Sequence, residues 1–141
     1  HLLLQKFPAP GFIVEVELRL DARHDGDAAG LMVFGCDYAW IGLRRIGGRL
    51  HAVFVRCENA HLGSPERTLE QHLLPEKIDG RSIQLRLEVT PGALCRFAWS
   101  WPDTPRVTLE ATFPARSSRW VGAKFGLFAS AYAASPPTPD S

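Results

Sequence analysis

Hydrophobic and polar residues alternate over most of this 141-residue chain. The clearest case is the stretch 12–20, where the even positions are apolar and charged residues occupy positions 15, 17 and 19. Successive side chains of a strand point to opposite faces, so this period of two predicts a strand with one buried face. Residues 83–89 repeat the pattern and predict a second such strand.

Further strands are predicted from shorter alternating or apolar stretches separated by turn residues. Gly47-Gly48 suits a tight hairpin because glycine accepts positive φ, and Asp79-Gly80 and Pro91-Gly92 are also typical of turns. Many short strands at this spacing favour an antiparallel β-sandwich. The further strands are predicted over residues 29–34, 39–45, 49–57, 68–73, 94–101, 107–112 and 122–129.

Length and composition indicate one folded domain. The sandwich is predicted to occupy residues 1–131, followed by a proline-rich tail or linker at 132–141. Net charge is +1 and the basic residues are scattered, which argues against a nucleic-acid or membrane-surface partner. Cys36, Cys57 and Cys95 show no Cys-x-x-Cys spacing, so we interpret them as small buried hydrophobic residues.

The turn His24-Asp25-Gly26-Asp27 is the one candidate metal site. Asp25 and Asp27 place two carboxylates around a glycine, and Ca²⁺ is bound in proteins by several oxygen ligands. The alternative is a polar hairpin in which the two Asp side chains bond to nearby backbone groups. No cofactor other than Ca²⁺ is suggested.

The aromatic residues offer candidate contacts for a carbohydrate. In a strand over 39–45, Tyr38, Trp40 and Arg44 share one face with Gly42 between them. Aromatic rings stack on sugar rings and arginine donates hydrogen bonds, so this face could bind a sugar; the other interpretation is that the aromatic residues are covered by a second layer. Trp99 is predicted to lie in the core, whereas Trp101 stands at a strand end and is a further candidate sugar contact.

Three segments together resemble one known family. They are the opening Leu2-Leu-Leu-Gln-Lys-Phe-Pro-Ala-Pro10, the stretch Gly26-Asp-Ala-Ala-Gly-Leu31, and a late stretch from Phe113 to Phe128 with Trp120 and Gly-Ala-Lys-Phe-Gly-Leu-Phe. In this order they resemble the C-terminal concanavalin-like module of glycoside hydrolase family 43 β-xylosidases, also classed as carbohydrate-binding module family 91. The resemblance covers roughly residues 2–128 and implies a jelly-roll sandwich of the concanavalin A type. It also implies that Trp120 closes one end of the sandwich.

The resemblance also implies a function. Such modules are non-catalytic parts of β-xylosidases or α-L-arabinofuranosidases, whose acid and base lie on a five-bladed propeller. The implied partners are that propeller and xylan or xylo-oligosaccharide. In the resembled enzymes the loop before Ala-Gly-Leu leans toward the propeller, and some members carry an aromatic residue there; this chain has none at that place.

No catalytic residues are predicted. Glu15-Val-Glu17 matches the first half of the Glu-x-Asp-x-x-Glu motif of family 16 glucanases, but the third acid would fall at Leu20. We therefore interpret the two glutamates as the solvent face of a strand. Two alternatives to the accessory module remain: a free-standing lectin-like sugar binder, and a small concanavalin-like hydrolase or lyase.

The resemblance also predicts an incomplete sheet. Modules of the family usually begin with a strand before the Leu-Leu-Leu-Gln-Lys-Phe segment and close with one after Gly-Leu-Phe. We expect an open edge beside the strand 12–20 or the strand 122–129, because neither flanking strand is in the sequence. That edge would be filled by a neighbouring chain, by the rest of the parent protein or by the chain's own tail.

Overall fold

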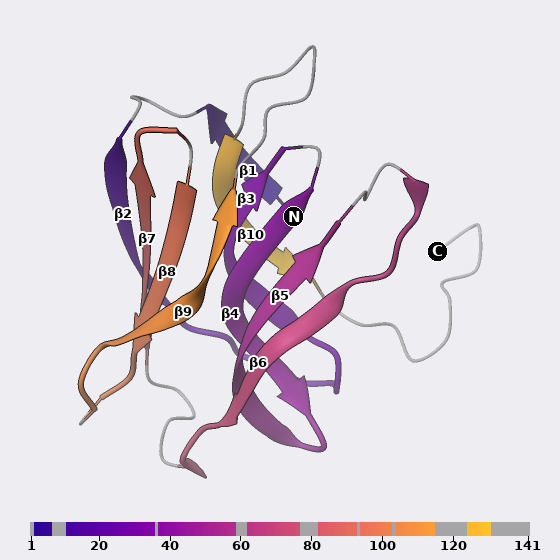
Figure 1. Ribbon diagram of the computed structural model, residues 1–141. Helices are drawn as coiled ribbons and strands as arrows, with labels where there is room; N and C mark the ends of the chain where they lie inside the picture. Colours follow the sequence, from indigo (N-terminus) through magenta and orange to yellow (C-terminus); the bar gives the residue numbers. More distant parts are fainter. Residues whose placement is uncertain are drawn as a thin grey trace.

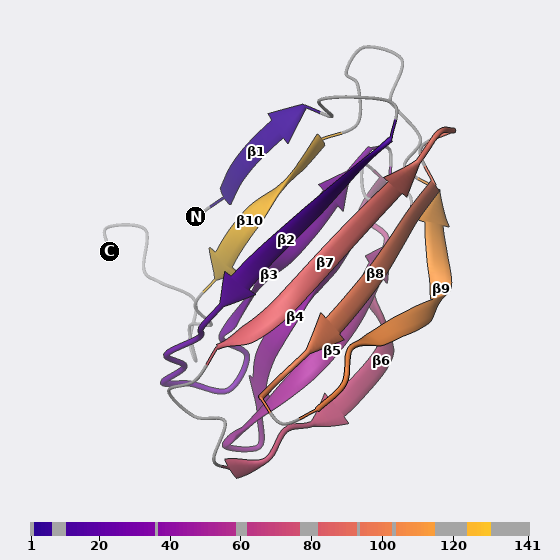
Figure 2. The ribbon, with the colours of Figure 1, turned by 90° about the vertical axis from the view of Figure 1, so that its left-hand side faces the viewer.

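The fold is a sandwich of two antiparallel sheets (Figures 1 and 2). The structure is a computed structural model that describes residues 2–6, 11–35, 37–58, 62–76, 82–92, 94–102, 104–114 and 124–130. In Figure 2 the four-stranded sheet lies in front of the six-stranded sheet. The predicted all-β concanavalin-like sandwich is confirmed.

The six-stranded sheet has the order β1-β10-β3-β4-β5-β6. Its strands are β1 (Leu2–Lys6), β10 (Lys124–Ser130), β3 (Ala28–Phe34), β4 (Tyr38–Ile46), β5 (Arg49–Cys57) and β6 (Arg67–Leu73). The four-stranded sheet has the order β2-β7-β8-β9. Its strands are β2 (Phe12–Leu18), β7 (Ile83–Thr90), β8 (Leu94–Ser100) and β9 (Val107–Pro114).

The main core lies between the two sheets. Phe54 of β5 and Phe97 of β8 meet there with ring centroids 5.3 Å apart, and Trp99 is 1% exposed. The inward residues of β7, from Ile83 to Val89, are also buried, so the alternation in the sequence correctly gives the core face. Cys57 and Cys95 are buried, as predicted.

A second apolar cluster lies on the outer face of the six-stranded sheet. As a result the central strands β3, β4 and β5 are buried on both faces over most of their length. The buried members of the cluster are Ala28, Met32, Trp40, Val53 and Val55.

Two glycines face each other across β3 and β4 within this cluster. Gly30 and Gly42 are direct partners in the strand register. A Cβ at Gly42 would overlap the carbonyl group of Ala29, and one at Gly30 would overlap the Ile41 carbonyl oxygen and lie 3.0 Å from the Trp40 and Phe128 rings. Only glycine fits at these two positions.

An open sheet edge was expected beside the strand 12–20 or the strand 122–129, and the structure has one beside the first. Within the described residues, β2 pairs only with β7, so the strand 12–20 does lie at an edge. The strand 122–129 does not, because β10 is paired with β1 on one side and β3 on the other. The strand β1 was not predicted, since Leu-Leu-Leu shows no alternation.

Several expectations fall outside the described residues: Cys36, Trp120 and the tail 132–141. No helix in the part of the chain that the structure describes is long and apolar enough to cross a membrane.

We predict that Gly42→Ala destabilises the domain by about 1–3 kcal/mol or more, because the added methyl group forces β3 and β4 apart. Chemical denaturation measures the loss. Gly11→Ala is the control, since the nearest atoms to its Cβ would lie at 3.4 Å, an ordinary contact, and the change should stay within about 0.5 kcal/mol. Equal stability of both variants would show that the strands adapt freely at Gly42.

Candidate functional site

Tyr38, Trp40 and Arg44 converge on a carboxylate that the sequence did not indicate. All three lie on the outer face of β4, as the alternation predicts. The Tyr38 hydroxyl donates to Glu66 Oε2 at 2.6 Å, and the Trp40 indole Nε1–H donates to the same oxygen at 3.3 Å. The Arg44 guanidinium lies 3.6 Å from Glu66 Oε1. We call these four residues the Glu66 cluster.

Trp40 is a packing residue in this structure. It is 1% exposed, and its ring meets Phe128 edge-on with centroids 4.8 Å apart. The Arg44 guanidinium lies 5.0 Å from the ring centroid, in the range of a cation–π contact. The ring therefore offers no free face on which a sugar could stack, which favours the second of the two interpretations given above.

Tyr38 is only half buried, and its ring lies 5.4 Å from that of Phe34. Burial raises the pKa of the Tyr38 hydroxyl far above its ordinary value, and its hydrogen bond to Glu66 adds to the effect. The phenol therefore stays a donor to the Glu66 carboxylate throughout the neutral range.

Glu66 lies just before β6, in a short loop whose sequence carries no periodic signal. It is 26 residues from Trp40 and 28 from Tyr38. Sequence patterns give local faces, so only the pairing of β4, β5 and β6 brings this residue over β4.

The Asp25 and Asp27 side chains both bond to groups of the protein, Asp27 within its own loop and Asp25 to the β4–β5 hairpin. Asp27 is buried, and its Oδ2 accepts hydrogen bonds from the backbone N–H groups of Arg23 and His24. Asp25 Oδ1 accepts from the Gly48 N–H at 2.8 Å and lies 3.3 Å from Arg45 Nε. Among the described residues, no three His, Cys, Asp or Glu side chains form a metal-binding group. Calcium binding here stays a prediction.

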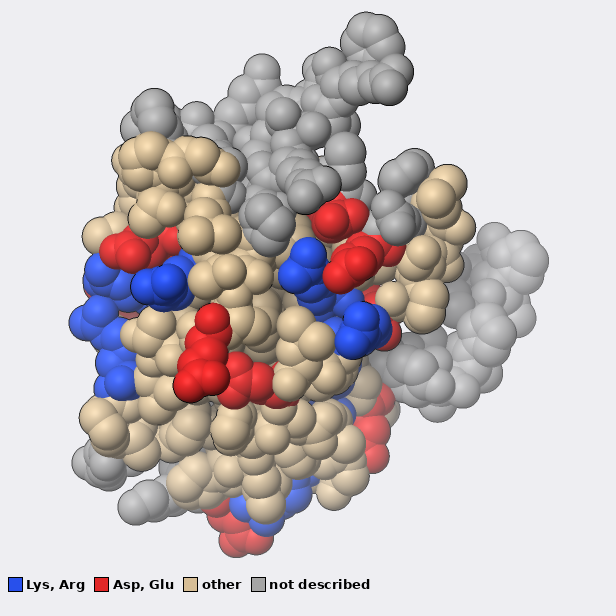
Figure 3. Space-filling model, in the orientation of Figure 1, with Lys and Arg blue, Asp and Glu red and all other residues tan. Residues whose placement is uncertain are grey.

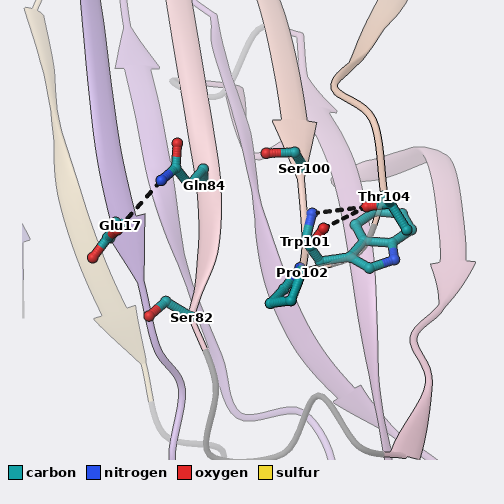
Figure 4. Close-up of a pocket in the computed structure, with 7 residues that line it drawn as sticks. All are labelled: Glu17, Ser82, Gln84, Ser100, Trp101, Pro102 and Thr104. Atoms are coloured by element: carbon teal, nitrogen blue, oxygen red, sulfur yellow. Dashed lines mark hydrogen bonds between the residues drawn. The ribbon is translucent and has the colours of Figure 1, made fainter.

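Trp101 borders a depression on the outer face of the four-stranded sheet (Figure 4). The depression has a volume of about 520 Å³, within the range of small-molecule sites. In Figure 4 the Trp101 ring lies beside Thr104, and Glu17 and Gln84 lie on the opposite side of the depression. The lining residues are Glu17, Ser82, Gln84, Ser100, Trp101, Pro102 and Thr104.

Of these residues, only Trp101 was expected from the sequence to contact a sugar. Alternation does place Glu17 and Gln84 on solvent-facing positions of their strands, but nothing in the sequence pairs β2 with β7. Glu15 and Glu17 are exposed, as predicted, and their side chains contact Arg86 and Gln84 across that pairing.

Charge is distributed in small groups. On the face shown in Figure 3, acidic and basic residues lie close to one another without a broad field of either sign. The described basic residues of this face therefore form no broad field of the kind that binds a polyanion.

The two antiparallel sheets and their order define a concanavalin A-like sandwich. Residues 1–138 match the family model of the β-xylosidase C-terminal concanavalin A-like domain. The chain therefore belongs to this family, which confirms the resemblance. No curated protein sequence matches it significantly.

Solved structures with the same fold are also glycoside hydrolase family 43 proteins. The chain matches a bifunctional GH43-CE protein of Bacteroides eggerthii with a TM-score of 0.76 and 20% identity, over 91% of this chain and 16% of that one. A GH43 enzyme engineered to show endo-xylanase and exo-arabinofuranosidase activity matches with a TM-score of 0.75 and 21% identity, over 92% of this chain and 27% of that one. GH43B from the Bacteroides ovatus xyloglucan PUL matches with a TM-score of 0.72 and 13% identity, over 92% of this chain and 25% of that one. The chain thus spans about a quarter or less of the length of these proteins.

We predict that Glu66→Ala lowers the free energy of unfolding by about 1–3 kcal/mol, because the buried indole N–H of Trp40 loses its acceptor. Glu66→Gln keeps an acceptor oxygen and should lose less. The control is Glu76→Ala: Glu76 is 82% exposed and forms only a surface ion pair with Arg49 at 3.7 Å, so its loss should stay within about 0.5 kcal/mol. Denaturant titration separates these outcomes.

The raised pKa of Tyr38 predicts a loss of stability at alkaline pH. Because the folded-state pKa lies above the unfolded value of about 10, this contribution is complete below pH 10 and declines as the pH rises beyond it. The chain has two tyrosines, and an alkaline titration followed by tyrosinate absorbance should show one of them ionising late in the wild type. In Tyr38→Phe the late step should be absent and the other tyrosine should still ionise. If both phenols of the wild type ionise near pH 10 while the chain is folded, the assignment is wrong.

Proposed function

We propose that this chain is the non-catalytic accessory module of a glycoside hydrolase family 43 enzyme of the β-xylosidase or α-L-arabinofuranosidase type. In that enzyme it packs on the five-bladed catalytic propeller. One observation carries the proposal: more than 90% of this chain aligns with parts that make up only 16–27% of longer family 43 proteins. The remaining length of such a protein is where a catalytic domain belongs.

The surface acids support a non-catalytic function. Glycoside hydrolysis usually takes two carboxylates that flank the scissile bond with the bond between them. Glu15 and Glu17 lie side by side on one strand face and contact Arg86 and Gln84, and Leu20 occupies the place of a third acid. This arrangement lacks an acid on the opposite side of a substrate.

We expect the isolated chain to show no hydrolysis of nitrophenyl xyloside or nitrophenyl arabinofuranoside. Release of nitrophenol, followed by absorbance, is the measurement. The matched variants are Glu15→Gln and Glu17→Gln, which remove the charge without changing the side-chain shape. Turnover by the wild type that either variant abolishes would revive the glucanase-like alternative.

Packing on the propeller has its own test. The catalytic propeller encoded with this chain should co-elute with it in size-exclusion chromatography when the two are produced separately. The propeller's melting temperature should also rise when the module is added. A gene that encodes no propeller would favour the free-standing lectin-like binder.

A second function of the same module is the binding of xylan or xylo-oligosaccharide. The depression beside Trp101 favours it, because several polar side chains line a hollow of small-molecule size there. The chain should migrate more slowly in a native gel that contains xylan than in a gel without it. Unchanged migration would leave packing on the propeller as the only function proposed.

A further inference from the structure

We propose that the depression on the outer face of the four-stranded sheet is a subsite for a neutral sugar unit, with Gln84 and Glu17 as its hydrogen-bonding centre. The inference rests on the xylan-binding function proposed above and specifies where it takes place. It moves the site from the Glu66 cluster on β4 to the opposite sheet.

The strand register produces a row of polar side chains across three strands. Glu17 of β2 is the partner of Gln84 in β7, and Gln84 is the partner of Ser100 in β8. Direct partners in antiparallel strands point to the same face, so all three side chains point outward. Gln84 Nε2 donates to Glu17 Oε1 at 3.3 Å, which orients the amide (Figure 4).

The depression exists because short side chains adjoin longer ones. Ser82 and Ser100 border it together with Thr104, and each carries a hydroxyl that can donate and accept. A sugar presents hydroxyl groups that also donate and accept, so it needs both kinds of partner within a small area. The carboxylate, the amide and the hydroxyls supply both kinds.

The β8–β9 turn fixes one end of the depression. The Trp101 N–H donates to Thr104 Oγ1 at 3.2 Å, and the Thr104 hydroxyl donates to the Trp101 carbonyl at 2.5 Å. The Trp101 ring lies 6.5 Å from the buried Trp99 ring and packs against the main core, which holds this end of β8 in place. Trp101 and Pro102 therefore border the depression in a fixed position before any ligand binds, which reduces the ordering cost of binding.

Charge selects a neutral ligand over an anionic one. Glu17 is the one charged residue among the described residues that line the depression. Arg86, in the neighbouring row, is within ion-pair distance of both Glu15 and Glu88. An acidic sugar would thus meet the Glu17 carboxylate in a depression whose described lining holds no cation, so xylose or arabinose units fit better than uronic acids. Arg106 lines the adjoining hollow, together with Gln84 and Ser100.

The test is a titration of the full chain with xylohexaose, followed by calorimetry. Gln84→Ala should weaken binding about tenfold, since it removes a donor and an acceptor that contact the sugar. Glu88→Ala is the matched control on the same strand and the same face, two rows from Gln84, and should leave the affinity unchanged. Ser100→Tyr should fill the depression and abolish binding, and circular dichroism checks that each variant is folded.

The anionic probe is an oligomer of galacturonate, which should not bind the wild type. Equal affinities of the wild type and Gln84→Ala, with xylohexaose still bound, would overturn the location and leave the proposed xylan binding intact. A wild type that binds no xylohexaose would overturn both, while packing on the propeller would still be decided by its own experiment. Tighter binding of the galacturonate oligomer than of xylohexaose would overturn the assignment to a neutral sugar.

Discussion

The close approach of β3 and β4 at Gly30 and Gly42 determines how the outer face of the larger sheet is built. With no side chain at either position, the Trp40 and Phe128 rings come to lie against the sheet at Gly30. The apolar cluster that forms there buries the central strands on their second face. The Trp40 ring is consequently used to complete the domain.

The two outer faces therefore differ in chemistry. On the six-stranded sheet one carboxylate, Glu66, receives the Tyr38 hydroxyl and the Trp40 indole and lies near Arg44, and the cluster closes over apolar side chains. On the four-stranded sheet the outward residues of β2 and β7, apart from Ile13, are polar and exposed or half-exposed, and several contact one another in rows. Such exposed pairs add little to stability, about 0–1 kcal/mol each, so this face can exchange them for contacts with a ligand at small cost.

Alternation predicted the strands and their buried faces well because it depends on neighbouring residues alone. Residues 49–57 were predicted with the observed bounds, and Trp99 was placed in the core. The strand β1 was missed because Leu2-Leu-Leu lacks alternation, and the sheet order was beyond reach because β10 inserts between β1 and β3. The burial of Trp40 depends on Phe128 and Glu66, which are distant in sequence. The same limit applies to Gln84 and Glu17, whose contact depends on the register between β2 and β7.

The position of β10 has a consequence for how the domain forms during synthesis. Among the described strands, β10 is the last in sequence and lies between β1 and β3, and β1 joins its sheet through β10. A ribosome delivers β3 about ninety residues before β10, and β1 earlier still, so the larger sheet cannot close until β10 has been made. Late closure over such long sequence separations slows folding, and it leaves the N-terminal strand unpaired until then. A segment placed before β1 would thus be tethered to an unfinished module throughout translation, and the two parts would dock only after β10 emerges.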